Sequence, residues 1–289
     1  MISVLITGAF GQVGTSLGRF MNQDYDLTLT GRNIPSSKKG IILDIRNTIA
    51  MKEIIDVVQP DVIINLAAMT SVDRCETEPE YAIQINTQSV KNICSLFSGR
   101  IIYLSTDYVF DGKNGPYSEN DIAKPINKYG ATKLESEKLI LENNPGSLVI
   151  RSNVVYDYNL NTQASFLNWV IQSLQNNLEI QVVNDQINNP TWSESLAQTI
   201  VLSIEKHISG IAHWGGADYL NRYDFAVKIA KKFSLNSNLI KPIETEELNQ
   251  PAKRPLNSGL KTSYLSKKLG ISPLTIDECL ETILKRVLQ

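Results

Sequence analysis

The stretch "ISVLITGAFGQVG", residues 2 to 14, determines the fold that we expect for this chain. Its apolar run, Ile2 to Ile6, is typical of a β-strand buried on both faces of a sheet. A helix is expected from about Gln12 to Met21, and three glycines lie around its start with the spacing Gly-x-x-Gly-x-x-Gly: Gly8, Gly11 and Gly14. Such a turn lets the backbone approach a pyrophosphate at the helix N-terminus. The stretch therefore predicts a dinucleotide-binding turn, although ordinary glycine-rich turns share this spacing.

Strands and helices alternate after this turn. Further buried strands are expected at Asp26 to Gly31, Ile41 to Asp44, Asp61 to Ala68, Ile101 to Ser105 and Ser147 to Tyr156. Helices are expected to begin near Asn47, Pro79 and Tyr129. This alternation predicts an α/β fold with a Rossmann-type doubly wound parallel sheet. The rest is expected to be helical at 163–175, 193–206, 222–233 and 276–289, with two polar loops, 182–192 and 249–263, as a substrate lid.

Composition narrows the classes of partner. With 289 residues, 42% hydrophobic and 20% charged, the chain resembles an ordinary globular protein. A net charge of −2 gives no reason to expect nucleic acid or an anionic membrane surface. No apolar run reaches membrane length and no basic leader is present, so we expect a cytoplasmic protein. The three cysteines (Cys75, Cys94 and Cys279) and two histidines form no ligand cluster, so neither disulfides nor a metal site is expected.

Residues at the strand ends suggest how a dinucleotide would bind. Arg32 follows the second strand, where a guanidinium suits a 2′-phosphate, so NADPH is expected and NADH stays possible. Asp44 and Ile45 could flank an adenine ring, or Asp44 could instead cap the next helix. Ala67 and Ala68 leave room for a ligand at the end of the fourth strand. In the helix near Pro79, one stripe of side chains is expected to face inward: Asn86, Val90, Ile93 and Phe97. The buried Asn86 amide needs hydrogen-bond partners, so we expect it to bridge to the active-site strand.

The stretch from Ser105 to Lys133 contains the candidate catalytic residues. A buried strand ends in Ser105, Thr106 and Asp107, and Tyr129 and Lys133 follow, four residues apart at the start of a helix. Residues at that spacing share one helix face, so the ammonium is expected to lower the pKa of the phenol. Tyr129 could then donate a proton to a carbonyl oxygen held by Ser105 or Thr106. Taken alone, a Tyr-x-x-x-Lys spacing is as typical of an exposed helical pair.

These motifs occur together in one order. They are "ITGAFGQVG", "SVDRCETEPEYAIQINT", "STDYVFDG", "YGATKLESE", "VVNDQINNPTW" and "PAKRPLNSGL". In this combination the chain resembles the extended short-chain dehydrogenase/reductases and, among them, the dTDP-4-dehydrorhamnose reductase family. The resemblance implies hydride transfer from NAD(P)H to a nucleotide-linked 4-keto-6-deoxy sugar. It also implies a Rossmann domain at residues 1–155 with returning segments near 186–212, and a smaller sugar-nucleotide domain comprising mostly 156–185 and 213–289.

The resemblance also implies roles for residues at matching positions. The catalytic residues would be Tyr129 as proton donor, Lys133 and Thr106. The cofactor would bind at Gly8, Gly11, Gln12, Val13, Gly14, Arg32, Asp44, Ile45, Ala67, Ala68, Met69, Ser105, Tyr129 and Lys133. The substrate would bind at Val72, Thr106, Asp107, Val154 and, through its diphosphate, Arg254, for which a surface charge between two prolines is the alternative.

Three departures from related patterns shape the expectation. Val154 replaces a sugar-pocket tryptophan of many members, so a different nucleotide-linked keto sugar stays open as the substrate. Ser16 replaces a glutamate that holds magnesium at a dimer interface in some members, so a monomer or a homodimer is expected without that metal. Tyr108 stands where sugar-nucleotide dehydratases have a glutamate, which favours reduction over elimination. The alternative of another class is a non-catalytic NADP-binding regulatory subunit, which resembles that of methionine adenosyltransferase.

Overall fold

The computed structural model describes residues 1–21, 23–158 and 165–288. In these ranges seven parallel strands form the main sheet in the order β11-β6-β5-β4-β1-β2-β3. They are β1 (Ile2–Thr7), β2 (Tyr25–Gly31), β3 (Ile41–Ile42), β4 (Val62–Asn65), β5 (Arg100–Thr106), β6 (Leu148–Ser152) and β11 (Gly210–His213). From β3 to β6 this is the 3-2-1-4-5-6 order of a doubly wound sheet, so the predicted fold class is confirmed. Its strand order reverses between β1 and β4, where such folds bind ligands.

Helices cover both faces of the sheet because the buried strands alternate their side chains between two cores. Val4 and Ile6 of β1 pack toward α1, α8 and α10, whereas Leu5 packs toward α2, α5 and α6. The helices of the first layer are α1 (Gln12–Phe20), α8 (Ser193–Glu205) and α10 (Ser263–Leu269). Those of the second are α2 (Thr48–Val58), α3 (Val72–Thr77), α4 (Pro79–Ile83), a π-helical turn η1 (Gln84–Gln88), α5 (Ser89–Leu96) and α6 (Lys128–Asn143).

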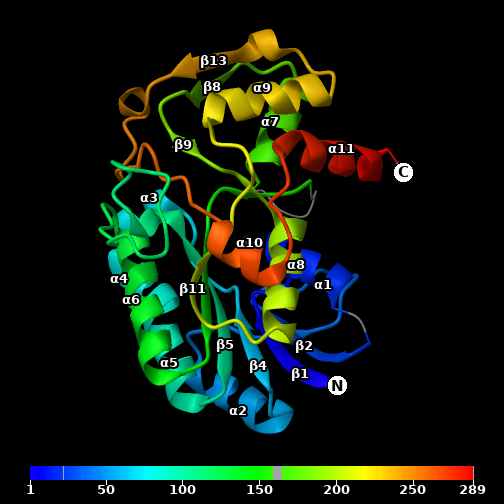
Figure 1. The fold of residues 1–289 in the computed structure, drawn as a ribbon, viewed down its shortest axis with the longest axis vertical. Coiled ribbons are helices and arrows are strands. Elements are labelled where there is room, and N and C mark those ends of the chain that lie inside the picture. The colour runs from blue at the N-terminus through cyan, green and yellow to red at the C-terminus, as the bar shows by residue number, and fades with distance from the viewer. Residues whose placement is uncertain (22, 159–164, 289) are drawn as a thin grey trace.

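A smaller group of elements lies at the other end of the molecule, in the upper half of Figure 1. Its core joins three helices to a two-stranded parallel sheet of β8 and β13. The elements are α7 (Phe166–Gln175), α9 (Arg222–Lys232), α11 (Ile276–Val287), β8 (Ile180–Val183) and β13 (Ile240–Ile243). Short pairs connect the two groups: β7 (Val155–Tyr156) with β10 (Thr191–Trp192), and β9 (Ile187–Asn188) with β12 (Leu220–Asn221). The 3₁₀ turns are η2 (Asp107–Val109), η3 (Ser237–Leu239) and η4 (Thr245–Leu248).

The strand expected from Ser147 to Tyr156 is wrong as one element. β6 ends at Ser152, and β7 pairs with β10 instead of continuing in the main sheet. Between them Val154 has φ 40°, a left-handed conformation that a β-branched residue rarely adopts. The chain therefore leaves the sheet at its carboxyl edge, beside the cavity described below.

Other expected elements differ in extent. The third strand is two residues long, Ile41–Ile42, and the helix expected from Pro79 is interrupted by η1. The polar segment 182–192 contains β9 and β10 instead of being a loop. The segment 249–263 is held by backbone hydrogen bonds, among them Asn257 N to Gly112 O at 2.9 Å and Lys261 N to Tyr117 O at 2.7 Å. These bonds hold the segment against the chain after β5, and its role in a substrate lid stays a prediction. The inward stripe with Asn86 is confirmed.

Candidate active site

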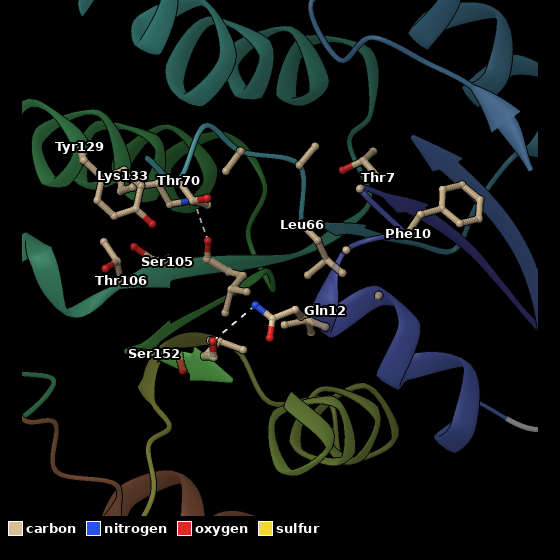
Figure 2. Close-up of a pocket in the computed structure, with 18 of the residues that line it drawn as sticks. Thr7, Phe10, Gln12, Leu66, Thr70, Ser105, Thr106, Tyr129, Lys133 and Ser152 are labelled. Carbon is tan, nitrogen blue, oxygen red and sulfur yellow. Dashed lines mark hydrogen bonds between the residues drawn. The ribbon is translucent and has the colours of Figure 1, made fainter. Parts of the chain in front are cut away.

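A cavity of about 770 Å³ opens at the carboxyl ends of β1, β4, β5 and β6. Figure 2 shows side chains from several of these strand ends facing it, with the turn before α1 on one side and α6 on the other. Sixteen predicted site residues line it: Gly8, Gly11, Gln12, Val13, Gly14, Arg32, Ile45, Ala67, Ala68, Val72, Ser105, Thr106, Asp107, Tyr129, Lys133 and Val154. The fold therefore gathers residues from seven separate stretches of sequence around one space.

The glycine turn is shaped by close backbone contacts. Gly8 has φ 67°, and a Cβ there would lie 2.8 Å from Ala67 N. A Cβ on Gly14 would lie 2.3 Å from Ala9 O, so α1 packs directly on the turn. At Gly11 a Cβ would meet only Gly8 O, at 3.4 Å, because this position borders the cavity. The turn thus has the form that a dinucleotide pyrophosphate requires.

The end of β5 is held by a chain of hydrogen bonds. Ser105 Oγ donates to Glu137 Oε1 at 2.5 Å, so its proton is not available to a ligand. Thr106 Oγ1 accepts from Tyr108 N at 3.2 Å and lies 3.1 Å from Asp107 Oδ1. Burial raises the pKa of the Asp107 carboxyl to about 6, opposed by hydrogen bonds from Ser258 and Thr106. Both hydroxyls donate to a carboxylate, but the bond of Thr106 is the longer one and Thr106 also interacts with the Tyr129 hydroxyl, so it is favoured over Ser105 to hold a carbonyl oxygen.

Tyr129 lies in the first turn of α6. Asn127 caps this helix by accepting a hydrogen bond from Gly130 N at 2.8 Å. A Cβ on Gly130 would lie 2.0 Å from Tyr108 O, so the glycine allows the helix to approach the loop after β5. In Figure 2 the Tyr129 hydroxyl points toward Thr106. The phenol, which is half-buried, thus faces the same part of the cavity as the hydroxyl of Thr106.

The expectation that Lys133 lowers the pKa of Tyr129 is wrong. Burial raises the pKa of the phenol above its ordinary value, and a hydrogen bond with Thr106 opposes this only in part. The Lys133 ammonium instead donates to Leu104 O at 2.7 Å and lies 4.0 Å from the centre of the Tyr103 ring. Tyr129 and Lys133 share a helix face, but the bond to the Leu104 carbonyl determines where the Lys133 ammonium points.

Lys133 itself is strongly perturbed. Burial lowers the pKa of its ammonium to about 7, and the Glu137 carboxylate one turn further along α6 acts in the opposite direction. Glu137 is itself buried and bonded to Arg151, with Arg151 Nε 3.0 Å from Oε1 and Nη2 2.6 Å from Oε2. A buried lysine with a perturbed pKa in a cleft is typical of a functional group.

Three predicted site residues lie away from this cavity. Asp44 is bonded to Arg46, with Arg46 Nε 2.9 Å from Asp44 Oδ1, and it does not cap α2, because Asn47 accepts from Ala50 N. Met69 is buried, and both its N–H and C=O are bonded to Asn86, which also donates to Thr132 Oγ1. Asn86 is therefore a bridge as predicted, but it joins the loop after β4 to α6 instead of reaching the active-site strand. Arg254 is bonded to Asp73 at 2.7 Å and lines a second cavity.

Sequence reasoning missed several residues of the cavity wall. They include Phe10, Leu43, Leu66, Thr70, Tyr108, Ser152, Asn153, Val155, Phe166 and Arg222. The missed residues that lie next to recognised motifs could have been predicted from their positions at strand ends, because ligands bind at the carboxyl ends of strands in open α/β sheets. Phe166 and Arg222 begin helices of the second half, where no motif marked them.

The described ranges contain neither a metal-ligand cluster nor a membrane-spanning helix. No group of three or more His, Cys, Asp or Glu side chains is arranged to hold a metal ion there. Ser16 is buried and bonded to Ser193 at 2.7 Å. Within the same ranges, no helix combines the length and apolarity needed to span a membrane.

The doubly wound sheet, the glycine turn and the Tyr129–Lys133 helix define a Rossmann-type protein of the short-chain dehydrogenase/reductase kind. More narrowly, the chain belongs to the family described as RmlD substrate binding domain, whose sequence model matches residues 2–289.

Individual relatives cover nearly the whole chain. It is 35% identical to a dTDP-4-dehydrorhamnose reductase of Aggregatibacter actinomycetemcomitans over 299 aligned positions, which cover 98% of each protein. It is also 35% identical to methionine adenosyltransferase 2 subunit beta of Bos taurus, over 94% of this chain and 84% of the relative. A solved dTDP-4-dehydrorhamnose reductase of Bacillus anthracis, in complex with NADP, superimposes with a TM-score of 0.89 at 29% identity, covering 99% of this chain and all of the other.

Proposed function

We propose that this protein is an NADPH-dependent reductase of the 4-keto group of a nucleotide-linked 4-keto-6-deoxy sugar, similar to dTDP-4-dehydrorhamnose reductase. The observation that supports this most directly is the meeting of Tyr129, Thr106 and Lys133 at one end of a cavity whose other wall is the glycine turn. A proton donor and a dinucleotide turn facing one space are what carbonyl reduction requires. The reductase relative from Aggregatibacter, which covers 98% of the chain, supports the same activity.

The cavity wall fits a nicotinamide dinucleotide. The pyrophosphate would lie against Gly11, Gln12 and Val13 at the start of α1. Arg32 would bind a 2′-phosphate, with Ile45 beside the adenine and Ala67 and Ala68 along the middle of the cofactor. Lys133 would bind the nicotinamide ribose. When bound, the cofactor supplies the hydride for the reaction.

Tyr129 would donate the proton. Because its pKa is raised, the phenol keeps its proton at neutral pH until negative charge develops on the carbonyl oxygen of the substrate. Thr106 Oγ1 would donate a hydrogen bond to the same oxygen after turning from Asp107. Val72 and Val154 would line the sugar pocket. Val154, in its strained conformation, would contribute a small side chain there, which leaves room for sugars with a bulkier substituent.

The two halves of the chain would bind different ligands. The main sheet, residues 1–155 with returning segments near 186–212, would bind the cofactor, and the remainder would bind the nucleotide sugar. We also propose that the protein acts in the cytoplasm. A monomer and a homodimer are both compatible with a site that is built within one chain.

The activity is tested by measuring NADPH oxidation with dTDP-, GDP- and CDP-linked 4-keto-6-deoxy sugars. We expect turnover with at least one of them, and the alcohol product should carry deuterium at C4 when deuterated NADPH is used. Binding of NADP⁺ without turnover on any of these sugars would contradict the proposal. Stoichiometric co-purification with a methionine adenosyltransferase would then favour the regulatory-subunit alternative, which the relative from Bos taurus represents.

Cofactor preference gives a first prediction. Arg32 is exposed at the edge of the cavity and donates a long hydrogen bond, 3.4 Å, to the Tyr81 hydroxyl. Arg32→Ala should raise the KM for NADPH by roughly 10- to 100-fold, since a charge-assisted contact contributes about 1.5–3 kcal/mol, and should leave that for NADH unchanged. Steady-state kinetics with both cofactors measure this, and equal losses for the two would contradict the role.

A second prediction concerns pH. Below about pH 7 Lys133 carries a proton, and above it the buried amine becomes neutral. Because kcat/KM for NADPH reports the free enzyme, it should decrease as the pH rises through about 7. Tyr129 should contribute no titration there because its pKa lies above the ordinary value. A kcat/KM that stays constant from pH 6 to 9 would contradict the need for the ammonium.

A further inference from the structure

A second cavity of about 330 Å³ adjoins the first and lies between it and the β8 strand. Four residues line both spaces: Val72, Tyr108, Phe166 and Arg222. A molecule longer than a sugar could therefore have one end near Tyr129 and Thr106 and extend past Arg222 into the second cavity. Trp169, which is 40% exposed, offers an aromatic ring in the wall of this cavity.

Arg222 is the first residue of α9 and stands where the two cavities meet. Its guanidinium carbon lies 5.4 Å from the centre of the Phe166 ring, which supports one face of the group. Its Nε is buried and has no hydrogen-bond partner among the described residues. A buried guanidinium nitrogen without a partner is costly, so it needs an acceptor that the protein does not provide.

The guanidinium of Arg254, unlike Nε of Arg222, has hydrogen-bond partners within the protein. Its Nη2 donates to Asp73 Oδ2 at 2.7 Å and its Nη1 to Ala252 O at 2.9 Å, and its side chain is 8% exposed. Asp73 also accepts from Ala252 N at 3.2 Å, so the pair fixes the 249–263 segment to α3. In the described wall of the second cavity the charged side chains are these two arginines. Since Asp73 already forms an ion pair with Arg254, Arg222 is the arginine of this wall without a direct ion pair among the described residues, although the Asp107 carboxyl lies near enough to interact with its charge.

We infer that Arg222 binds the diphosphate of the substrate, and that Arg254 is a structural residue. This inference rests on the proposed function and identifies the anion-binding residue of that same site. The diphosphate is negatively charged, and pairs of its oxygen atoms can accept two parallel hydrogen bonds from a guanidinium. The sugar would then lie toward Thr106 and Tyr129, and the nucleoside toward Trp169.

The cofactor phosphates are a poorer match for Arg222. A dinucleotide pyrophosphate requires the glycine turn, where Gly8 and Gly11 allow close backbone approach. Arg222 instead lies near the catalytic end, close enough to Asp107 to act against the rise of its carboxyl pKa caused by burial. An anion at Arg222 would therefore belong to the molecule that reacts with Tyr129.

The test measures binding of nucleoside diphosphates to the NADP⁺-saturated protein by calorimetry. The probes are dTDP, UDP, GDP and CDP, none of which needs turnover. For the tightest of these, Arg222→Ala should raise Kd by roughly 10- to 100-fold, and Arg222→Lys should restore part of the loss. In turnover assays KM for the sugar nucleotide should rise with little change in kcat, because the contact exists in ground and transition states alike.

Controls separate this inference from the proposed function. Lys228→Ala removes a charge from the same helix outside both cavities, where Lys228 pairs with Asp277 at 2.8 Å, and should leave Kd unchanged. Unchanged thermal unfolding and NADP⁺ affinity of Arg222→Ala would show that the fold is intact. If Arg222→Ala binds the diphosphate as tightly as the original protein, the inference is overturned and the reductase proposal stands. If the original protein binds none of the four diphosphates, both are overturned.

Discussion

Replacing Tyr129 by phenylalanine should decrease kcat by roughly 10²- to 10⁴-fold, the range associated with loss of a general acid. The phenol faces the cavity beside Thr106. Because its pKa is raised, it keeps its proton until negative charge develops on the carbonyl oxygen of the substrate. Phenylalanine keeps the ring, which packs edge-on against Tyr108 with 5.8 Å between ring centres, and removes only the hydroxyl. Single-turnover kinetics with NADPH and the keto-sugar nucleotide would measure the effect on the chemical step.

Binding measurements show whether that loss is chemical. NADPH affinity of Tyr129→Phe should match that of the original protein, because the glycine turn and Arg32 are untouched. Tyr264→Phe is a matched control, since this tyrosine on α10 is 41% exposed and lies outside the cavity. A kcat for Tyr129→Phe close to that of the control would exclude Tyr129 as the proton donor.

The main sheet could be predicted because its signals are local. Continuous apolar strands such as Ile2 to Ile6 and the glycines after them specify a buried parallel strand and its turn within a few residues. The break at Val154 could not be predicted in this way. Valine ordinarily favours an extended strand, whereas here the chain leaves the sheet after Val154 and β7 pairs with β10, whose residues lie 36 positions further along.

Site residues that belong to a sequence motif could be predicted. The ion-pair partners of charged side chains could not, because they lie far apart in the sequence. The sequence places Arg254 between two prolines but does not show that Asp73, 181 residues away, is its partner. It likewise does not reveal that Arg222 Nε is buried without a hydrogen-bond partner among the described residues. The pKa of Tyr129 illustrates the same limit, because spacing on a helix fixes proximity but not burial or the direction of an ammonium.

Behind the catalytic end lies the buried pair of Glu137 and Arg151, whose side chains are 2% and 3% exposed. Glu137→Gln should destabilise the protein by about 3–5 kcal/mol, because it leaves the Arg151 charge buried without a counter-charge. It also weakens the acceptor of the Ser105 hydroxyl at the end of β5. Urea unfolding monitored by fluorescence would give this change as a shift in midpoint with the slope unchanged.

A double variant isolates the interaction from the local packing. Replacing both Glu137 and Arg151 by methionine removes both charges, so the loss should be smaller than the sum of the two single Met variants, with a coupling of about 0.5–3 kcal/mol. Glu78→Gln on the surface is the matched control, since its pair with Arg74 is exposed and its loss should leave the free energy of unfolding nearly unchanged. If Glu137→Gln costs no more than this control, the buried pair does not stabilise the catalytic strand. Ser105 would then depend on β5 and α6 packing alone for its position.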